Sequence, residues 1–183
     1  DQATETIVAV AGQDVIPKLE FIQSDSMRLR QTKEVGGSFR FIHIDGEHSY
    51  DAVINDLALA EHWLSPMGVI VVDDFFSASC PGITEAVFDF CRSHNYVIVP
   101  FLIGYNKAYL CRSRYLGMYR GFILDLPERL ESHGLKVQLC AGGFAHERTY
   151  FGISGRASAN RYQLVGRYIP DAETFISAIN DFW

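Results

Sequence analysis

Apolar, strand-like segments alternate with helix-length segments along the first 113 residues, and this alternation constrains the fold more than any other feature. The run GVIVVDD (68–74) is apolar without interruption up to its two aspartates, as expected for a strand buried on both faces of a parallel sheet. Helical crossovers are the usual connection between parallel neighbours. The pattern therefore predicts an α/β domain with a mostly parallel sheet.

Periodicity, turn residues and capping residues set the boundaries of these segments. We expect strands at 19–25, 39–45 and 68–74, and helices at 3–12, from 26, at 49–64, and from 81 to about 93. Two further strands, 96–104 and 106–113, flank the turn Gly104-Tyr105-Asn106. They predict an antiparallel hairpin that closes the sheet.

Residues 114–183 follow a different pattern. A helix near 116–133, interrupted at Pro127, precedes three strand-like segments, LKVQLC, YFGIS and RYQLVG, and the chain ends in a helix from Asp171. We therefore divide the chain into a partial α/β domain (1–113) and a C-terminal α+β elaboration (114–183) that packs on it.

The composition excludes several classes of partner. A net charge of −6 without a basic cluster argues against a nucleic-acid-binding surface. No apolar run approaches the roughly 20 residues that a membrane-spanning helix needs, so no membrane segment is predicted. The four cysteines are scattered without a CxxC spacing, which favours reduced thiols and a cytoplasmic protein.

Acidic side chains follow two of the expected strands. Asp45, Glu47 and His48 come directly after FIHI, and Asp73 and Asp74 end the run at 68–74. If these strands are parallel neighbours, the aspartates meet at the edge of the sheet where α/β proteins place ligands. Carboxylates this close need a proton or a cation, and their hard oxygens favour Mg²⁺, with Mn²⁺ or Ca²⁺ as alternatives. The other interpretation is that each aspartate only caps a turn or a helix.

The stretch IDGEHSYDAVINDLALAEHWLSPMGVIVVDDFFSASCPGITEAV resembles the second half of a class I S-adenosylmethionine-dependent methyltransferase with a Rossmann-like sheet. Three features carry the resemblance: an I-D-G-acid strand end, P-x-G before a strand that ends in Asp-Asp, and a Cys-Pro-Gly helix start. They are similar to the metal-dependent macrocin- and novobiocin-type sugar O-methyltransferases, and more distantly to catechol O-methyltransferases. The resemblance covers roughly residues 19–113, so 1–113 is identified as a partial methyltransferase domain.

This resemblance implies roles for the acidic strand ends. Asp45, Asp73 and Asp74 match the metal ligands of the sugar-modifying branch, where the metal holds two vicinal substrate oxygens. Glu47 matches a catalytic carboxylate of the macrocin-like enzymes, and His48 matches the position of a lysine or histidine base in other branches. We favour His48 as the base, because an imidazole accepts a proton readily near neutral pH. Glu47 remains the alternative.

The resemblance also implies S-adenosylmethionine as cofactor. Asp25 and Ser26 match positions that contact the adenine ring, although Ser-Asp-Ser at a turn is also ordinary capping chemistry. Asp1 is the candidate for the acid that holds the ribose. The family's Gly-rich loop has no counterpart in the sequence, so the chain is expected to be N-terminally incomplete, either as a fragment or as a domain completed from elsewhere.

These observations predict a Mg²⁺-dependent O-methyltransferase that acts on a hydroxylated small molecule or a sugar, with no nucleic-acid or membrane partner and a possible homodimer. One alternative is a methyltransferase-like remnant that serves as an interaction module. A Mg²⁺-dependent phosphatase is a third hypothesis, but it needs a second aspartate at the position of Glu47. The tail, 114–183, carries no motif that identifies an acceptor.

Overall fold

A computed structural model describes residues 2–12, 22–29, 39–144, 148–155, 162–164 and 167–182 of the chain. Asp1 and residues 19–21 of the expected first strand lie outside these ranges. Residues 22–25 are described and form neither helix nor strand, so the expectation of a strand through residue 25 is wrong there. No helix in the described parts of the chain has the length and apolar character needed to cross a membrane.

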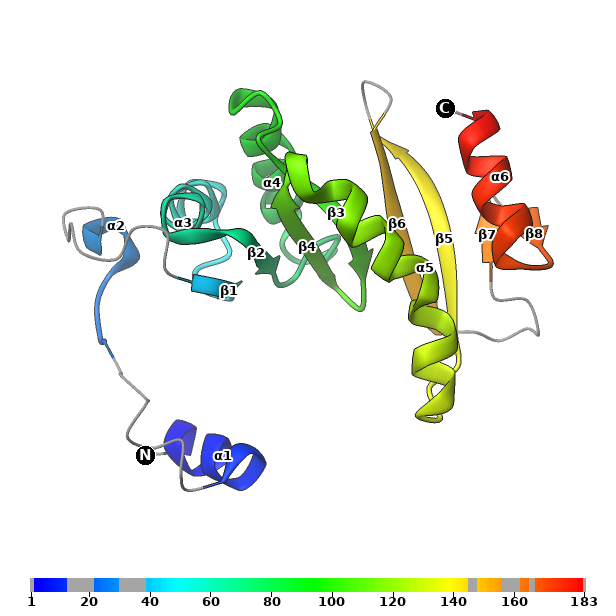
Figure 1. Cartoon of the computed structure of the whole chain (residues 1–183). Helices are drawn as coiled ribbons and strands as arrows, with labels where there is room; N and C mark the ends of the chain where they lie inside the picture. Colours follow the sequence, from blue (N-terminus) through cyan, green and yellow to red (C-terminus); the bar gives the residue numbers. More distant parts are fainter. Residues whose placement is uncertain are drawn as a thin grey trace.

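The first part of the chain follows the expected alternation of helices and strands (Figure 1). Helix α1 lies apart from the sheet in this view. In chain order the elements are α1 (Gln2–Ala11), α2 (Ser26–Leu29), β1 (Phe39–Ile44), α3 (Tyr50–Trp63), β2 (Leu64–Val72), α4 (Pro81–Ser93), β3 (Ile98–Gly104) and β4 (Lys107–Arg112). The hairpin turn uses Tyr105 and Asn106, both with positive φ, as a tight two-residue turn requires.

The second part of the chain continues the same sheet. A 3₁₀ turn (Ser113–Tyr115) leads into α5 (Leu116–Ser132), followed by β5 (Val137–Phe144), β6 (Arg148–Gly155), β7 (Tyr162–Leu164), β8 (Arg167–Ile169) and α6 (Ala172–Phe182). Pro127 lies inside α5 without ending it, contrary to the expected interruption. Strand β8 was not anticipated from the sequence.

The strands form one mixed sheet in the order β1-β2-β4-β3-β6-β5-β7-β8. Strand β1 pairs in parallel with β2, and β4 runs antiparallel between β2 and β3. Strand β6 then pairs in parallel with β3. The pairings give β1, β2, β3, β6 and β8 one direction, and β4, β5 and β7 the other. This arrangement confirms the α/β Rossmann-like fold, with the reversed strand β4 in the hairpin position that the sequence predicted.

Two apolar clusters lie on opposite faces of the sheet. In β2, Ile70 and Val72 pack with Leu57 of α3 and Phe90 of α4, whereas the side chain of Val69 packs against the second cluster. That second cluster joins β3, β5, β6 and β7 to α5 and α6. Burial on both faces explains why the sequence of β2 is apolar without alternation.

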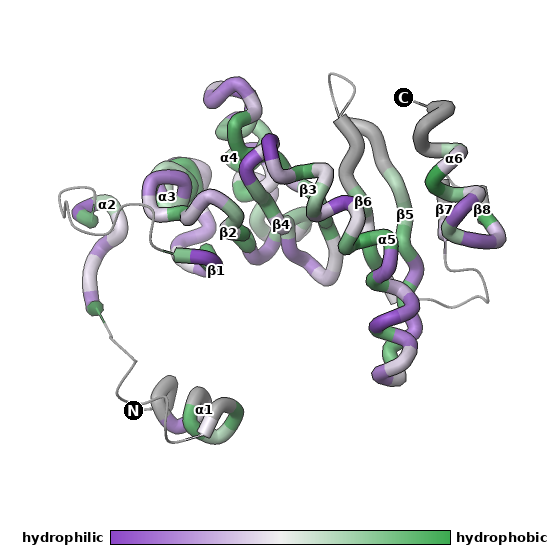
Figure 2. The backbone as a smooth tube through the Cα atoms, in the orientation of Figure 1, coloured by the Kyte–Doolittle hydropathy of each residue, from purple (hydrophilic) through white to green (hydrophobic). Residues whose placement is uncertain are grey.

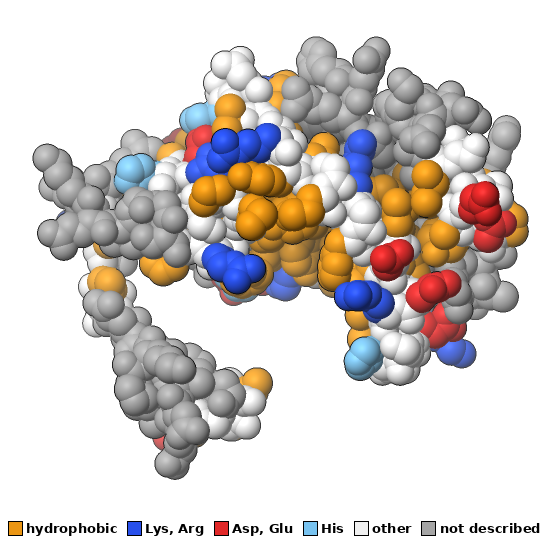
Figure 3. Space-filling view, viewed as in Figure 1, with side chains coloured by type: hydrophobic (Ala, Val, Ile, Leu, Met, Phe, Trp, Pro, Cys, Tyr) orange, Lys and Arg blue, Asp and Glu red, His pale blue; other side chains and the backbone are white. Residues whose placement is uncertain are grey.

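The distribution of hydropathy follows these two layers. Figure 2 shows hydrophobic residues along the central strands and hydrophilic residues over much of the second half of α5. Figure 3 shows hydrophobic side chains gathered near the middle of this face, with Lys and Arg side chains above and below them. Among the described residues, Phe41 and Met67 are exposed by 62% and 54%.

The junction between β3 and β6 depends on Gly104. A Cβ atom at this position would lie 2.2 Å from the carbonyl oxygen of Ile153, its pairing partner in β6. Only glycine permits this approach without a shift of the backbone. The C-terminal strands therefore join the sheet at a point that tolerates no side chain.

Candidate functional site

The acidic residues after β1 and β2 meet at the carboxyl ends of these strands. Ile44 and Val72 are partners in the parallel ladder, and the backbone N–H of Asp73 donates to the Ile44 carbonyl at 3.0 Å. Asp45 and Asp73 are therefore the next residues on neighbouring strands. The sequence-based expectation that Asp45, Asp73 and Asp74 lie at one edge of the sheet agrees with this geometry.

Asp73 and Asp74 lie in a tight turn that directly follows β2. Asp74 adopts φ 53°, a left-handed conformation that aspartate tolerates better than most residues, and its N–H donates to Asp73 Oδ1 at 2.9 Å. The hairpin turn supports this geometry from the other side. The Asn106 side-chain amide donates to Asp74 Oδ1 at 2.6 Å, and the Asn106 carbonyl accepts from the N–H of Phe75 at 3.0 Å.

His48 approaches the carboxylates from the loop between β1 and α3. Its Nε2 atom lies 3.3 Å from Asp74 Oδ2 and 3.9 Å from Asp45 Oδ1. Its Nδ1 atom lies 3.4 Å from the sulfur of Cys80, the residue that precedes α4. Ser49 fixes the loop by capping α3, since its hydroxyl accepts from the N–H of Ala52. The expected helix start at Ser49 is thus confirmed.

The structure offers two candidate groups of metal ligands, and Asp45 belongs to both. One combines Asp45 with His48 and Asp74, and the other combines Asp45 with His43 and Asp73; within each group the ligand atoms lie within 4.8 Å of one another. The carboxylate oxygens fit a hard divalent cation such as Mg²⁺ or Mn²⁺, whereas an imidazole donor favours a softer cation such as Zn²⁺. The side chain of His43 is 39% exposed, and its Nε2 lies 3.5 Å from Asp73 Oδ2.

Lys107 is a site residue that sequence reasoning missed. Its ammonium group donates to Asp73 Oδ2 and forms an ion pair with it. This hydrogen bond lowers the pKa of the Asp73 carboxyl, and the same contact raises the pKa of Lys107. The signal in the sequence is its position: Lys107 is the first residue after the hairpin turn, and Ala108 pairs with Val72. The position of Lys107 beside the end of β2 can therefore be predicted only when the register of β4 against β2 is known.

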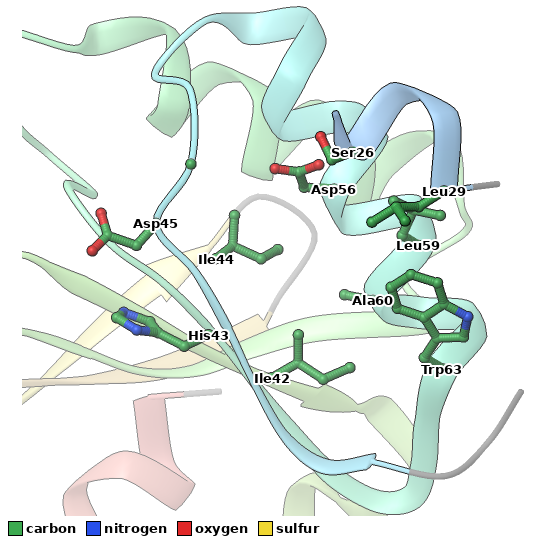
Figure 4. Close-up of a pocket in the computed structure, with 11 residues that line it drawn as sticks. Ser26, Leu29, Ile42, His43, Ile44, Asp45, Asp56, Leu59, Ala60 and Trp63 are labelled. Atoms are coloured by element: carbon green, nitrogen blue, oxygen red, sulfur yellow. The ribbon is translucent and has the colours of Figure 1, made fainter. Parts of the chain in front are cut away.

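A pocket of about 320 Å³ lies on the other side of β1 (Figure 4). Ile42 and Ile44 point into it from β1, opposite Leu59, Ala60 and Trp63 of α3. Polar side chains stand at one end, where Ser26 and Asp56 lie close together in the figure. Asp45 and His43 also contribute to the lining, but their side chains point away from Ile42 and Ile44 in the figure, so the carboxylate cluster lies across β1 from the pocket.

The remaining predicted site residues have less specific surroundings. Glu47 is exposed and forms no hydrogen bond or ion pair with another described residue. Asp25 accepts from the N–H of Met27 at 2.9 Å, which is capping chemistry at the start of α2. Ser26 lines the pocket, whereas Asp1 lies outside the described residues. The structure therefore brings Asp45, Asp73, Asp74 and His48 together, whereas Glu47 and Asp25 are not part of this group.

Residues 2–75 match a family model described as a methyltransferase domain. The match covers less than half of the chain and supports the presence of a methyltransferase domain in that part. The matched stretch includes β1, α3, β2 and all three aspartates of the site, and it supports methyltransferase activity. No curated protein sequence matches the chain.

Proposed function

We propose that this chain is the catalytic part of a metal-dependent O-methyltransferase that uses S-adenosylmethionine and acts on a hydroxylated small molecule or a sugar. The observation that carries the proposal is the meeting of Asp45, Asp74 and His48 at the sheet edge, inside the stretch that matches a methyltransferase domain. The macrocin- and novobiocin-type branch is the one whose aspartate pattern this site resembles.

The carboxylates provide the part of the site that would hold a divalent cation. Asp45 and Asp74 direct oxygens towards the same space, and Asp73 lies beside them. When bound, such a cation lowers the pKa of a coordinated hydroxyl and fixes its orientation. The turn at Asp74 and its hydrogen bond from Asn106 keep the Asp74 carboxylate in place before any substrate arrives.

His48 is the proposed base. Its Nε2 atom faces the carboxylates and is placed to take a proton from a substrate hydroxyl held between Asp45 and Asp74. Its Nδ1 atom faces Cys80, which limits rotation of the ring. Glu47 remains the alternative base, although its exposed side chain forms no hydrogen bond or ion pair with the described residues.

The pocket beside β1 is the proposed place for the adenine ring of the cofactor. Its apolar walls suit a planar ring, and the Ser26 hydroxyl and Asp56 carboxylate can bond ring nitrogens and the exocyclic amine. Asp25 stays a proposed neighbour of this ring, and Asp1 a proposed ribose ligand. A homodimer and a cytoplasmic location likewise stay predictions.

The proposal is tested by calorimetric titration of S-adenosylhomocysteine into the whole chain, first with Mg²⁺ and then with EDTA. Trp63 lines the pocket, so binding should also change its fluorescence in a Trp183→Phe variant. Micromolar binding with a Trp63 signal would support the methyltransferase. Mg²⁺ binding without S-adenosylhomocysteine binding would indicate that a further segment or chain completes the cofactor site. Binding of neither ligand would favour an interaction module without activity.

A further inference from the structure

We propose that Lys107 is a positioning residue that occupies Asp73 and thereby confines a divalent cation to Asp45 and Asp74, beside the proposed base His48. The inference rests on the proposed function and narrows it, because the two candidate ligand groups share Asp45 and cannot both be used by a single ion. It also changes the ligand set that the sequence pattern implied, in which Asp73 is a full ligand.

The Asp73 carboxylate already has hydrogen bonds on both oxygens. Oδ1 accepts from the N–H of Asp74, and Oδ2 accepts from the Lys107 ammonium group. His43 Nε2 lies 3.5 Å from the same Oδ2 atom, and the Asp73 side chain is only 18% exposed. A metal ion at Oδ2 would stand next to an ammonium group, and the repulsion between these charges makes this position unfavourable.

The fold holds Lys107 in this place. It is the first residue of β4, it pairs with Gly104 across the hairpin, and the next residue pairs with Val72 at the end of β2. Its side chain is 31% exposed, so water screens the ion pair only in part.

The other group has no such competitor. Among the described residues, no lysine or arginine forms an ion pair with Asp45 or Asp74. The hydrogen bond from Asn106 uses Asp74 Oδ1 and leaves Oδ2 directed towards His48. With neutral histidines, the three carboxylates and the one ammonium group carry a net charge of −2, which one divalent cation balances.

The test measures Mn²⁺ binding to the whole chain from the electron paramagnetic resonance signal of the free ion. Asp74→Asn should weaken binding at least about tenfold, because it removes a charged ligand. Asp73→Asn should weaken binding less than Asp74→Asn does, by about fivefold or less, since it removes a nearby charge but no ligand of the ion. Asparagine tolerates the left-handed backbone at position 74, so Asp74→Asn should keep the fold, and Asp73→Asn retains a side-chain oxygen for the N–H of Asp74.

Lys107→Met should tighten Mn²⁺ binding about fivefold or more, because it removes a positive charge and frees Asp73. When Asp73→Asn is added to Lys107→Met, it should weaken Mn²⁺ binding. Lys107→Arg should behave as the wild type, and Lys136→Met, which removes the same charge from an exposed position, should leave the affinity unchanged. Circular dichroism of each variant checks that it is folded.

The outcomes separate this inference from the proposed function. If the wild type binds Mn²⁺ and Asp73→Asn weakens it as much as Asp74→Asn does, Asp73 is a full ligand and the inference about Lys107 is overturned. The same holds if Lys107→Met behaves like Lys136→Met. If neither the wild type nor Lys107→Met binds Mn²⁺, the proposed metal dependence fails together with the inference.

Discussion

The two ring nitrogens of His48 face different partners: Nδ1 lies 3.4 Å from the Cys80 sulfur, and Nε2 lies 3.3 Å from the Asp74 carboxylate. The loop after β1, the turn after β2 and the start of α4 therefore converge on one imidazole. A base needs one free nitrogen near the substrate and a contact that orients the ring. In His48 the contact of Nδ1 with Cys80 can orient the ring, and Nε2, on the side of Asp74, is the nitrogen that can face the substrate.

The first prediction concerns this imidazole. His48→Ala should lower the rate of methyl transfer about 10²–10⁴-fold, the usual contribution of a general base, while S-adenosylhomocysteine affinity changes little. The measurement is transfer of a labelled methyl group to a panel of catechols and sugars with vicinal hydroxyls. His62→Ala, at the end of α3, is the matched control and should keep full activity. If Glu47→Gln abolishes transfer and His48→Ala is silent, Glu47 is the base.

A second prediction uses Cys80 as a reporter of the site. Iodoacetamide should label Cys80 faster than Cys91 and Cys111, because Cys80 is partly exposed and the other two are buried. Burial also raises the pKa of the Cys111 thiol to about 12, which leaves almost no reactive thiolate at neutral pH. Mass spectrometry of the labelled peptides gives the order. Equal labelling of Cys80 and Cys111 would contradict the described burial.

The local elements of the site could be read from the sequence because each depends on short-range signals. Ser49 before an amphipathic stripe predicts the start of α3, and Pro81 predicts the start of α4. The parallel pairing of β1 and β2 then places Asp45 beside Asp73. These steps need only the pattern of apolar residues and the rule that helices connect parallel neighbours.

The surroundings of the aspartates could not be read in this way, because they depend on pairing between distant strands. Lys107 and Asn106 enter the site from the hairpin, and their positions follow from the register of β4 against β2. Pro127 was expected to interrupt a helix, but it lies within α5 and is buried there, so tertiary packing overrides its local preference.

A third prediction tests the apolar layer beneath the site. Leu57 of α3 is fully buried among side chains of β2 and α4, so Leu57→Ala should lower the free energy of unfolding by about 2–5 kcal/mol. Met67→Ala, at a position 54% exposed, should change it by less than about 0.5 kcal/mol. Urea titration followed by circular dichroism measures both. Equal effects of the two variants would show that α3 does not pack as described.

A fourth prediction concerns the junction between the methyltransferase-like strands and the C-terminal strands. Gly104→Ala should destabilise the protein by about 1–3 kcal/mol, because the new methyl group meets the Ile153 carbonyl oxygen. Gly152→Ala is the matched control, since its Cβ would meet no atom closer than 3.7 Å. Thermal unfolding of both variants should separate them clearly. If both substitutions are neutral, β6 does not lie against β3 in solution.

The last prediction is a pH dependence at the start of α6. Asp171 Oδ1 accepts from the N–H of Thr174 at 2.8 Å, and Oδ2 accepts from the Thr174 hydroxyl at 3.0 Å. The backbone hydrogen bond, and then the hydroxyl, lower the pKa of the Asp171 carboxyl below its usual 3.8. A carboxyl whose pKa is lower in the folded state stabilises that state above pH 3.8, and this stabilisation is lost as the pH falls through the lowered value.

Asp171→Asn should therefore lower the melting temperature at pH 7, because asparagine keeps a side-chain oxygen for the Thr174 N–H but loses the charge at the helix N-terminus. The difference from the wild type should shrink once the pH falls below about 3.8, where protonation removes the same charge from Asp171. Asp171→Ala removes both oxygens and should remain less stable than the wild type at either pH. Melting curves from pH 7 to pH 2.5 test this, and a constant gap between the wild type and Asp171→Asn would show that the charge contributes nothing to α6.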